Sequence, residues 1–323
     1  MRRRTFLVSA AAAAAGMPQS VLAQNAAKFP NRPIALICPW TAGGPTDVVM
    51  RTMAEVAGRH LGQPVIVDNK AGANGTLGPA TMAIAKPDGY TIAQMTMGMI
   101  RLPLMQKTSF DTLKDFTHIV QLTGYIFGVS ARGDSPFKTW AGVIEQAKVI
   151  PGKVTYGHTG AGGSLHIGME QMAALSGVKL TPVPFKGESE AFAALIGGHV
   201  DLMAAGTGRQ DMIDSGQIRI LNIWTEKRSK RLPEVPSIRE LGYPFTFDSP
   251  WGFAGPKGMD PEVVKILHEA FKKALDDPGV LAAMERYEMQ PQYLGSADYR
   301  AFVVKQIEQE RGFLDRIGLL KKE

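Results

Sequence analysis

The sequence predicts an α/β protein built as two lobes. Short apolar segments typical of strands alternate with amphipathic segments typical of helices along the whole chain. Removal of a predicted export signal, residues 1–23 of 323, leaves 300 residues, which is more than one compact core usually holds. A strand, a Gly-rich loop and a helix follow one another twice, near residues 34 and 154, which suits one such unit in each lobe.

The N-terminus predicts export from the cytoplasm. Arg2-Arg3-Arg4 precedes an apolar run at 8–15, and Val21-Leu22-Ala23 supplies a small-residue cleavage site. Arg3-Arg4-Thr5-Phe6-Leu7 is similar to a twin-arginine signal, and an ordinary Sec signal with an extra arginine is the alternative. We expect cleavage after Ala23 and an extracytoplasmic mature chain, since no other apolar run is long enough to span a bilayer.

Composition and charge exclude several classes of function. The mature chain carries 33 basic side chains (36 less the three arginines of the signal) and 30 acidic ones, a net charge of roughly +3. No basic block is interleaved with aromatic residues, so we expect no nucleic-acid partner. The short basic stretch at 227–231 predicts a solvated loop. Cys38 is the single cysteine, which excludes an intramolecular disulfide, and its place in an apolar strand predicts a buried small hydrophobe.

The first strand–loop–helix unit predicts an anion site. Residues 34–38 form the apolar run of a buried strand, and the residues after position 45 show one apolar helical face. Between them, Gly43 and Gly44 leave the backbone open to close approach, and Pro45 suits the first helical turn. Free N–H groups at such a helix start bind anions, and Asp47 complements the helix dipole. An ordinary tight turn is the alternative interpretation.

The alternation continues to the C-terminus. Further strands are predicted at 65–68, 90–95, 154–156, 181–185, 200–204 and 218–224. Further helices are predicted at 76–85, 139–150, 164–175, 191–196, 261–275, 278–287 and 297–317, the last two on the surface. Met95, Met97 and Met99 stand at alternate positions, which predicts one face of an extended segment that belongs to the core or to a pocket wall.

The second Gly-rich loop, 157–163, leads to a helix for which Ser164 is a suitable N-cap. This unit is neither a P-loop nor a dinucleotide fingerprint, and Ser164 does not stand in a nucleophile elbow. His158 and His166 lack the cysteine or carboxylate neighbours of a metal site. We therefore expect no metal, no cofactor and no catalytic residue.

In order along the mature chain, these motifs resemble the extracytoplasmic solute receptors of tripartite tricarboxylate transporters, the Bug family. The motifs are 39–47 with Arg51, 69–75, 87–91, 151–156 with Gly160, Gly162, Ser164 and Ile167, 184–187, 197–201 and 232–238. The resemblance implies a type II periplasmic binding protein, with two α/β lobes and a ligand cleft between them. It also implies carboxylate ligands held mainly by backbone N–H groups and ordered waters.

This interpretation sets the expected domains and partners. Lobe 1 comprises residues 24–124 and 248–323, lobe 2 comprises 125–247, and a hinge lies near Gly124 and near 247–251. We expect a monomeric periplasmic protein that binds a small carboxylate and delivers it to the membrane components of a tripartite transporter. The alternatives are a secreted hydrolase or lyase acting on a small acid, for which no nucleophile–base pair is found, and a sensor or partner module without transport.

The candidate ligand-binding residues come mainly from the two Gly-rich units. They are Trp40, Thr41, Ala42, Gly43, Gly44, Thr46 and Asp47 in the first unit, Thr159, Gly160, Gly162, Gly163, Ser164 and His166 in the second, and Gly98, Lys186, Asp201 and Thr207 elsewhere. We expect hydroxyl donors from Thr41, Thr46, Thr159 and Ser164. Asp47 is expected to hold a water or fix the loop, and Lys186 to face the cleft mouth. Ala71, Asn74, His158 and 204–207 depart from the family pattern, so the identity of the ligand stays open.

Overall fold

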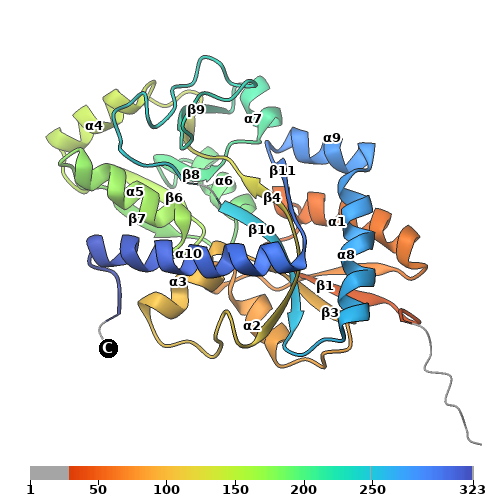
Figure 1. The fold of residues 1–323 in the computed structure, drawn as a ribbon. Helices are drawn as coiled ribbons and strands as arrows, with labels where there is room; N and C mark the ends of the chain where they lie inside the picture. Colours follow the sequence, from red (N-terminus) through yellow and green to blue (C-terminus); the bar gives the residue numbers. More distant parts are fainter. Residues whose placement is uncertain (1–28, 248, 322–323) are drawn as a thin grey trace, which may run out of the picture.

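The computed structural model describes residues 29–247 and 249–321 and shows two β-sheets flanked by helices (Figure 1). The predicted export signal and its cleavage after Ala23 lie outside the described residues. Among the residues that are described, no helix combines the length and the apolar character needed to cross a membrane.

The first sheet has six strands in the order β11-β4-β10-β3-β1-β2. Its strands are β1 (Ile34–Cys38), β2 (Val65–Asn69), β3 (Thr91–Met95), β4 (Phe116–Tyr125), β10 (Ser249–Pro256) and β11 (Gln290–Leu294). β1 is parallel to β2 and β3, whereas β10 is antiparallel to both β3 and β4. Because β1, β2 and β3 run the same way, the loops that follow β1 and β3 meet at one edge of the sheet.

The second sheet has five strands in the order β7-β6-β8-β5-β9. Its strands are β5 (Phe127–Arg132), β6 (Thr155–His158), β7 (Thr181–Pro184), β8 (Leu202–Gly206) and β9 (Ile218–Ile223). β6 is parallel to β7 and β8, and β5 is antiparallel to β8 and β9. Both sheets therefore place an antiparallel strand, which has just arrived from the other sheet, beside three parallel strands. The chain crosses between the sheets after β4 and again before β10.

Helices cover both faces of each sheet (Figure 1). They are α1 (Pro45–Leu61), α2 (Leu77–Ala83), α3 (Met97–Met105), α4 (Trp140–Val149), α5 (Ser164–Leu175), α6 (Glu188–Ile196), α7 (Gln210–Asp214), α8 (Pro261–Leu275), α9 (Pro278–Arg286) and α10 (Ser296–Arg316), with a short 3₁₀ turn at Ala73–Gly75. Each sheet with its helices is called a lobe below, and the predicted two-lobed α/β fold is confirmed.

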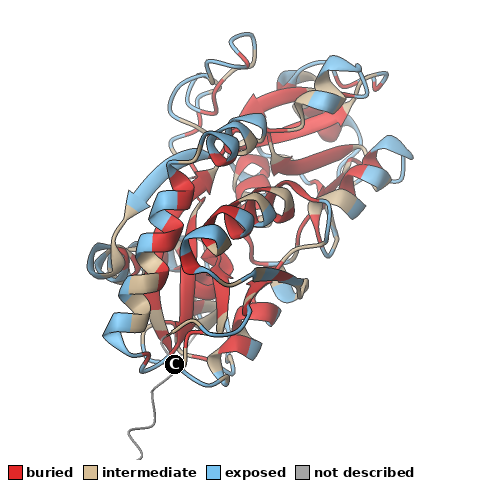
Figure 2. Cartoon of the chain, turned by 90° about the vertical axis from the view of Figure 1, so that its right-hand side faces the viewer, coloured by how far each residue is buried: buried red, intermediate tan, exposed pale blue. Residues whose placement is uncertain are grey.

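The cores lie between the sheets and these helices. α1, α8 and α9 pack on one face of the first sheet, where Phe253 and Phe271 are fully buried, and α2 and α3 pack on the other face. In the second lobe α4 and α5 cover one face and α6 and α7 the other. Figure 2 shows the central strands of the sheets buried and the outer helix surfaces exposed, and the edge strand β11 is also largely exposed. Cys38 is buried among these apolar side chains, as predicted.

One predicted element is wrong. The alternate methionines Met95, Met97 and Met99 do not share an extended segment, because β3 ends at Met95 and α3 begins at Met97. All three are buried, since α3 lies between the first sheet and the C-terminal helix. A short, wholly apolar run contains no periodicity that separates helix from strand.

α10 is not the simple surface helix that its pattern predicts. Near its start, Tyr299 and Val303 pack against Ile100 of α3, whereas Leu314 near its end is fully buried in the core of the second lobe. Figure 1 shows the helix (dark blue) running across the molecule. The amide of Lys321 then donates to the carbonyl oxygen of Leu104 at 2.9 Å. The C-terminal helix therefore fastens the two lobes together.

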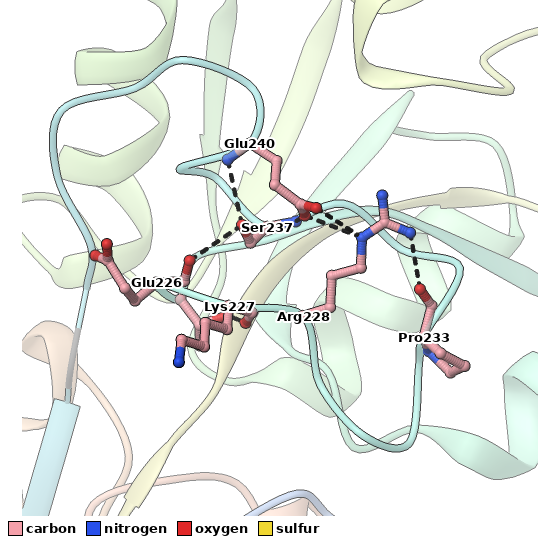
Figure 3. A network of polar contacts seen from close by, with 7 residues as sticks. Glu226, Lys227, Arg228, Pro233, Ser237 and Glu240 are labelled. Atoms are coloured by element: carbon pink, nitrogen blue, oxygen red, sulfur yellow. Dashed lines mark hydrogen bonds and ion pairs between the residues drawn. The ribbon is translucent and has the colours of Figure 1, made fainter.

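Side chains fasten the long connection between β9 and β10 (Figure 3). Arg228 donates through Nε to both carboxylate oxygens of Glu240 at 3.0 Å and through Nη1 to the carbonyl oxygen of Pro233 at 2.8 Å. Nearby, the Ser229 hydroxyl donates to Glu288 of the first lobe at 2.5 Å, and Arg231 donates to the Glu285 carbonyl oxygen. The stretch 227–231, predicted to be a solvated loop, thus makes specific contacts between the lobes.

We predict that Leu314→Ala lowers the free energy of unfolding by about 2–5 kcal/mol, because it opens a cavity in the core of the second lobe. Leu319→Ala is the matched control, since Leu319 is 40% exposed, and we expect it to change stability by about 0.5 kcal/mol or less. Urea denaturation measures both. Equal, small losses would show that the end of α10 contributes no packing energy to the second lobe.

Candidate functional site

A cavity lies between the lobes, where β1, β3 and β6 end. From the first lobe it is lined by Trp40, Thr41, Gly44, Pro45, Thr46, Asn74, Thr96, Met97, Gly98, Tyr125 and Ser249. From the second lobe it is lined by Phe127, Thr159, Ser164, Leu165 and Glu188. The structure thus brings together the predicted residues Trp40, Thr41, Gly44, Thr46, Gly98, Thr159 and Ser164 from both lobes. It adds lining residues that the sequence analysis did not select, among them Asn74, Tyr125 and Glu188.

Four helices begin at this cavity. First-turn residues of α1 (Thr46), α3 (Gly98), α5 (Ser164) and α6 (Glu188) line it. Amide groups in the first turn have no acceptor within their own helix, and the helix dipole adds partial positive charge there. None of the lining side chains in the described chain is a lysine, arginine or histidine. The cavity therefore attracts negative charge through its backbone.

Two side-chain donors at the cavity lack partners. Trp40 Nε1 and Thr41 Oγ1 are buried and have no hydrogen-bond partner within the described part of the chain. A buried polar atom without a partner costs about 1–3 kcal/mol, so such atoms in a cavity indicate a ligand or water that satisfies them. Both belong to the loop after β1, which the sequence analysis selected.

Asp47 holds the loop after β1 in place. Its carboxylate accepts hydrogen bonds from the Gly43 amide at 2.9 Å, from Arg51 Nε at 3.0 Å and from Asn69 Nδ2 at 2.7 Å. Burial by itself would raise the pKa of Asp47, but these bonds hold that pKa below its usual value. Of the two roles expected for Asp47, fixing the loop is the one that the structure shows. Gly43 is exposed and its amide is used by Asp47, so it does not line the cavity.

The loop after β6 uses its own amides differently from the prediction. The Gly160 amide donates to His158 Nδ1 at 3.1 Å, and the Gly162 amide donates to His166 Nδ1 at 3.3 Å. Gly163 donates to the Gly160 carbonyl oxygen at 3.4 Å. Because these N–H groups already have acceptors, Gly160, Gly162, Gly163 and His166 shape the loop and do not line the cavity. The amides that follow, at the start of α5, are the ones left for an anion.

Ser164 is the first residue of α5, and Gly163, not Ser164, is the N-cap. The Ser164 side chain instead contacts Arg101 of α3, whose Nη1 donates to Ser164 Oγ at 2.5 Å and whose Nε and Nη2 donate to both carboxylate oxygens of Glu310 at 2.7 Å. Since an arginine only donates, the Ser164 oxygen accepts and its own hydrogen is left for another acceptor. Arg101 is 2% exposed and joins both lobes to α10. A lone arginine in an apolar helix is the sequence signal that would have identified it.

Glu188 is the second residue that the sequence analysis missed. It begins α6, and its Oε1 accepts from the Gly206 amide at 2.8 Å. Burial raises its pKa, against the opposing effects of the Gly206 amide and the charge of Arg209. Glu188 directly follows Lys186-Gly187, and this position in the motif could have identified it. Only the lysine of that motif was selected as a candidate.

Asp201 lies away from the cavity, which corrects its selection as a site residue. Its Oδ2 accepts from both the amide and the hydroxyl of Thr155 at 2.8 Å, at the start of β6. The cavity lies beyond the other end of that strand, where Thr159 lines it. Asp201 therefore ties the beginnings of β6 and β8 together.

Three more selected residues do not line the cavity. Ala42 is exposed at the tip of its loop, and Lys186 is exposed, with its amide donating to Glu190 at 3.1 Å. Thr207 is buried at the crossing between the lobes, where its hydroxyl bonds to the Ile126 carbonyl oxygen and to Glu288. The expectation that Lys186 faces the mouth of the cleft stays a prediction. Within residues 29–247 and 249–321, no group of three or more His, Cys, Asp or Glu side chains is placed to hold a metal ion.

Comparisons with known proteins agree with one another. The family described as "Tripartite tricarboxylate transporter family receptor" matches residues 49–319. A Cupriavidus necator protein, the "UPF0065 protein in gbd 5'region", is 42% identical over the full length of both chains. The structure of the periplasmic binding protein BugD is 31% identical, with a TM-score of 0.86, over 91% of this chain and 100% of the other. MatC from Rhodopseudomonas palustris, solved with bound malate, is 28% identical, with a TM-score of 0.81, over 88% of this chain and 99% of the other.

We predict that Arg101→Met lowers the free energy of unfolding by about 3–5 kcal/mol, because it leaves the Glu310 carboxylate buried without its partner. The double variant Arg101→Met with Glu310→Met removes both charges at similar volume, and we expect it to recover most of that loss. Urea denaturation compares them. A double variant as unstable as the single one would contradict an ion-pair origin of the effect.

We predict that stability falls as the pH falls from about 6.5 toward 4. Burial lowers the pKa of His158 to about 4, so the folded state binds fewer protons than the unfolded one in this window and loses stability there. The buried His118, whose pKa is also lowered to about 4, adds to the same slope. His158→Gln keeps an acceptor for Gly160. We expect it to reduce the loss of unfolding free energy across this pH window by up to about 3 kcal/mol relative to the wild type. Denaturation curves between pH 4.5 and 7.5 measure it, and parallel slopes would rule out His158.

Proposed function

This chain belongs to the tripartite tricarboxylate transporter receptor family, and on that premise we propose that it captures a small carboxylate between its lobes in the periplasm. The captured acid is then delivered to the membrane components of a transporter of that type. The relative MatC, with its bound malate, supports a carboxylate as the ligand class. The proposed receptor is a monomer and uses no cofactor.

The observation that carries this proposal is the set of free donors around the cavity. Helix starts from both lobes and the unpartnered atoms Trp40 Nε1 and Thr41 Oγ1 meet at one cavity. A carboxylate accepts several such bonds at once, and bonds to an ionised acceptor are short and strong. Among the lining residues within 29–247 and 249–321, no nucleophile lies beside a base, so these residues do not favour the alternative of a hydrolase or lyase.

We assign the ligand contacts from this geometry. In the first lobe the amide of Thr46 and the side chains of Trp40 and Thr41 face the carboxylate, and Gly44 leaves the backbone accessible. The Thr46 hydroxyl is hydrogen-bonded to Tyr125 OH at 2.8 Å and positions that phenol at the cavity wall. In the second lobe Ser164 donates its amide and its hydroxyl, the latter freed by the bond from Arg101. Thr159, Gly98 and ordered waters complete the set.

The lobes touch across the cavity. A Cβ placed on Gly187 would come within 2.3 Å of Thr41 Oγ1, and one on Gly163 within 2.2 Å of Asn74 Oδ1. We therefore interpret this arrangement as a closed form, in which the two lobes move against each other, and the end of α10, whose Leu314 packs in the core of the second lobe, moves with that lobe. The crossings lie after Tyr125 and near Phe247, and Tyr125 itself lines the cavity. A ligand that contacts both lobes favours closure because only the closed form offers all of its contacts.

We predict that a library of small carboxylates contains compounds that raise the melting temperature. A ligand at a hundred times its Kd adds about 2.7 kcal/mol to stability. For a compound so identified, Gly44→Val should weaken binding by roughly 30-fold or more, because its side chain blocks the approach to the helix start. Gly44 has φ −77°, so valine is not strained there.

Calorimetry measures the affinities, and Gly142→Val in α4 is the control. Gly142 is half-buried and does not line the cavity, and a Cβ added there would have only Thr139 Oγ1, at 3.5 Å, as a neighbour. If Gly44→Val binds as tightly as the wild type, the loop is only a turn. If no carboxylate in the library binds, the proposed function fails.

A further inference from the structure

Glu188 is unusual in a cavity suited to anions, because it is the one acidic side chain among the lining residues of the described chain. One of its oxygens, Oε1, accepts from the Gly206 amide at 2.8 Å. The other, Oε2, has no hydrogen-bond partner within residues 29–247 and 249–321. When Glu188 is ionised, Oε2 is an acceptor at the cavity wall that a donor on the ligand, or a water, can satisfy.

The cations near Glu188 do not neutralise it fully. Arg209 is close enough to act on its charge, but Arg209 Nε and Nη2 donate to both carboxylate oxygens of Asp211 at 3.2 and 3.1 Å. Lys186 is exposed, and the first turn of α6 holds a second acid, Glu190. Burial raises the pKa of Glu188 and so disfavours its ionised form, whereas a cationic group bound beside it would favour that form.

Charge balance then constrains the ligand. A helix start supplies the equivalent of about half a positive charge, so the starts of α1, α3 and α5 together supply about one and a half, enough for one ligand carboxylate but not for two, while the start of α6 acts on Glu188 itself. A ligand with carboxylates only would place a like charge against Glu188, which is unfavourable at short range. A ligand that also carries an ammonium group would pair that group with Glu188 Oε2. A hydroxyl group would donate a hydrogen bond there but would leave the charge unbalanced.

We propose that Glu188 selects small carboxylates that also carry an amino group, so that the preferred ligand is a small amino acid. This inference rests on the proposed function and names its substrate class. The cavity volume agrees with a small ligand: about 50 Å³ is open to the centres of water molecules, and one water needs roughly 10–15 Å³. The ammonium donates to Glu188 in the second lobe while the carboxylate accepts from helix starts of both lobes.

The test uses two matched series of acids. Succinate, L-malate and L-aspartate share one carbon skeleton and differ at one carbon by hydrogen, hydroxyl or ammonium; propionate, L-lactate and L-alanine form the second series. Calorimetry on the full mature chain at pH 7.5 gives the affinities. In the series that binds, we expect the amino member to bind about tenfold or more tighter than the other two, since a hydrogen bond between charged groups contributes that much.

Glu188→Gln separates this inference from the proposed function. The glutamine oxygen can still accept from Gly206, but the group facing the cavity becomes a donor. We expect the preference for the amino member to fall by roughly tenfold or more and the affinity for the unsubstituted acid to rise. Glu190→Gln, on the exposed side of the same helix, is the matched control and should leave both affinities unchanged.

The outcomes are distinct. If an acid without an amino group binds the wild type as tightly as its amino counterpart, and Glu188→Gln does not change this ratio, the inference is overturned while the receptor function stands. If no acid of either series or of the wider library binds, the receptor function itself falls. Should Glu188→Gln fail to fold, as judged by its melting curve, the wild-type ratios within each series still decide the question.

Discussion

Amide groups at the start of a helix have no acceptor within that helix, and the organisation of this protein follows from where those groups are satisfied. Asp47 accepts the Gly43 amide, and His158 and His166 accept the amides of Gly160 and Gly162. These bonds fix the two Gly-rich loops without help from a ligand. The amides that remain, in the first turns beyond the loops, are gathered around the cavity. The N–H groups that stabilise the two loops are therefore different from those that remain for a ligand, although both sets lie in the same two segments.

The buried ion pair of Arg101 and Glu310 connects this arrangement to the rest of the molecule. Burying two charges is costly, and a pair of apolar side chains would often be at least as stable. Here Arg101 has a third contact, the Ser164 oxygen, which an apolar residue would not provide. The pair thus connects three elements, α3, α5 and α10. It also orients the Ser164 hydroxyl, because the oxygen accepts from Arg101 and the hydrogen is left to donate elsewhere.

Much of the fold was predictable from the sequence, because strands such as 34–38 and helices such as 261–275 have clear periodicity and clear ends. The helix at Met97 was missed because its apolar residues lie on all sides. About half of the residues that line the cavity could also be predicted, because a Gly-rich loop directly after a strand is visible in the sequence. Glu188 and Arg101 were not predicted, because what makes each of them notable is a partner far away in the chain, Gly206 for one and Glu310 for the other. Gly160 and Gly162 were assigned a wrong role because the ring nitrogens that occupy their amides are seen only in the folded loop.

The insertion of β10 between β3 and β4 has a consequence for synthesis. The second sheet is assembled from strands within residues 127–223, a continuous piece of chain, whereas the first sheet needs residues 249–256 to join its two halves. On the ribosome, the strands of the second sheet are therefore all available while β3 and β4 still have open edges. Unpaired edges invite association with other chains, and non-local pairings form slowly. The lobe whose synthesis begins first is thus the last to be completed. Its strand edges stay unpaired until the final quarter of the chain has emerged.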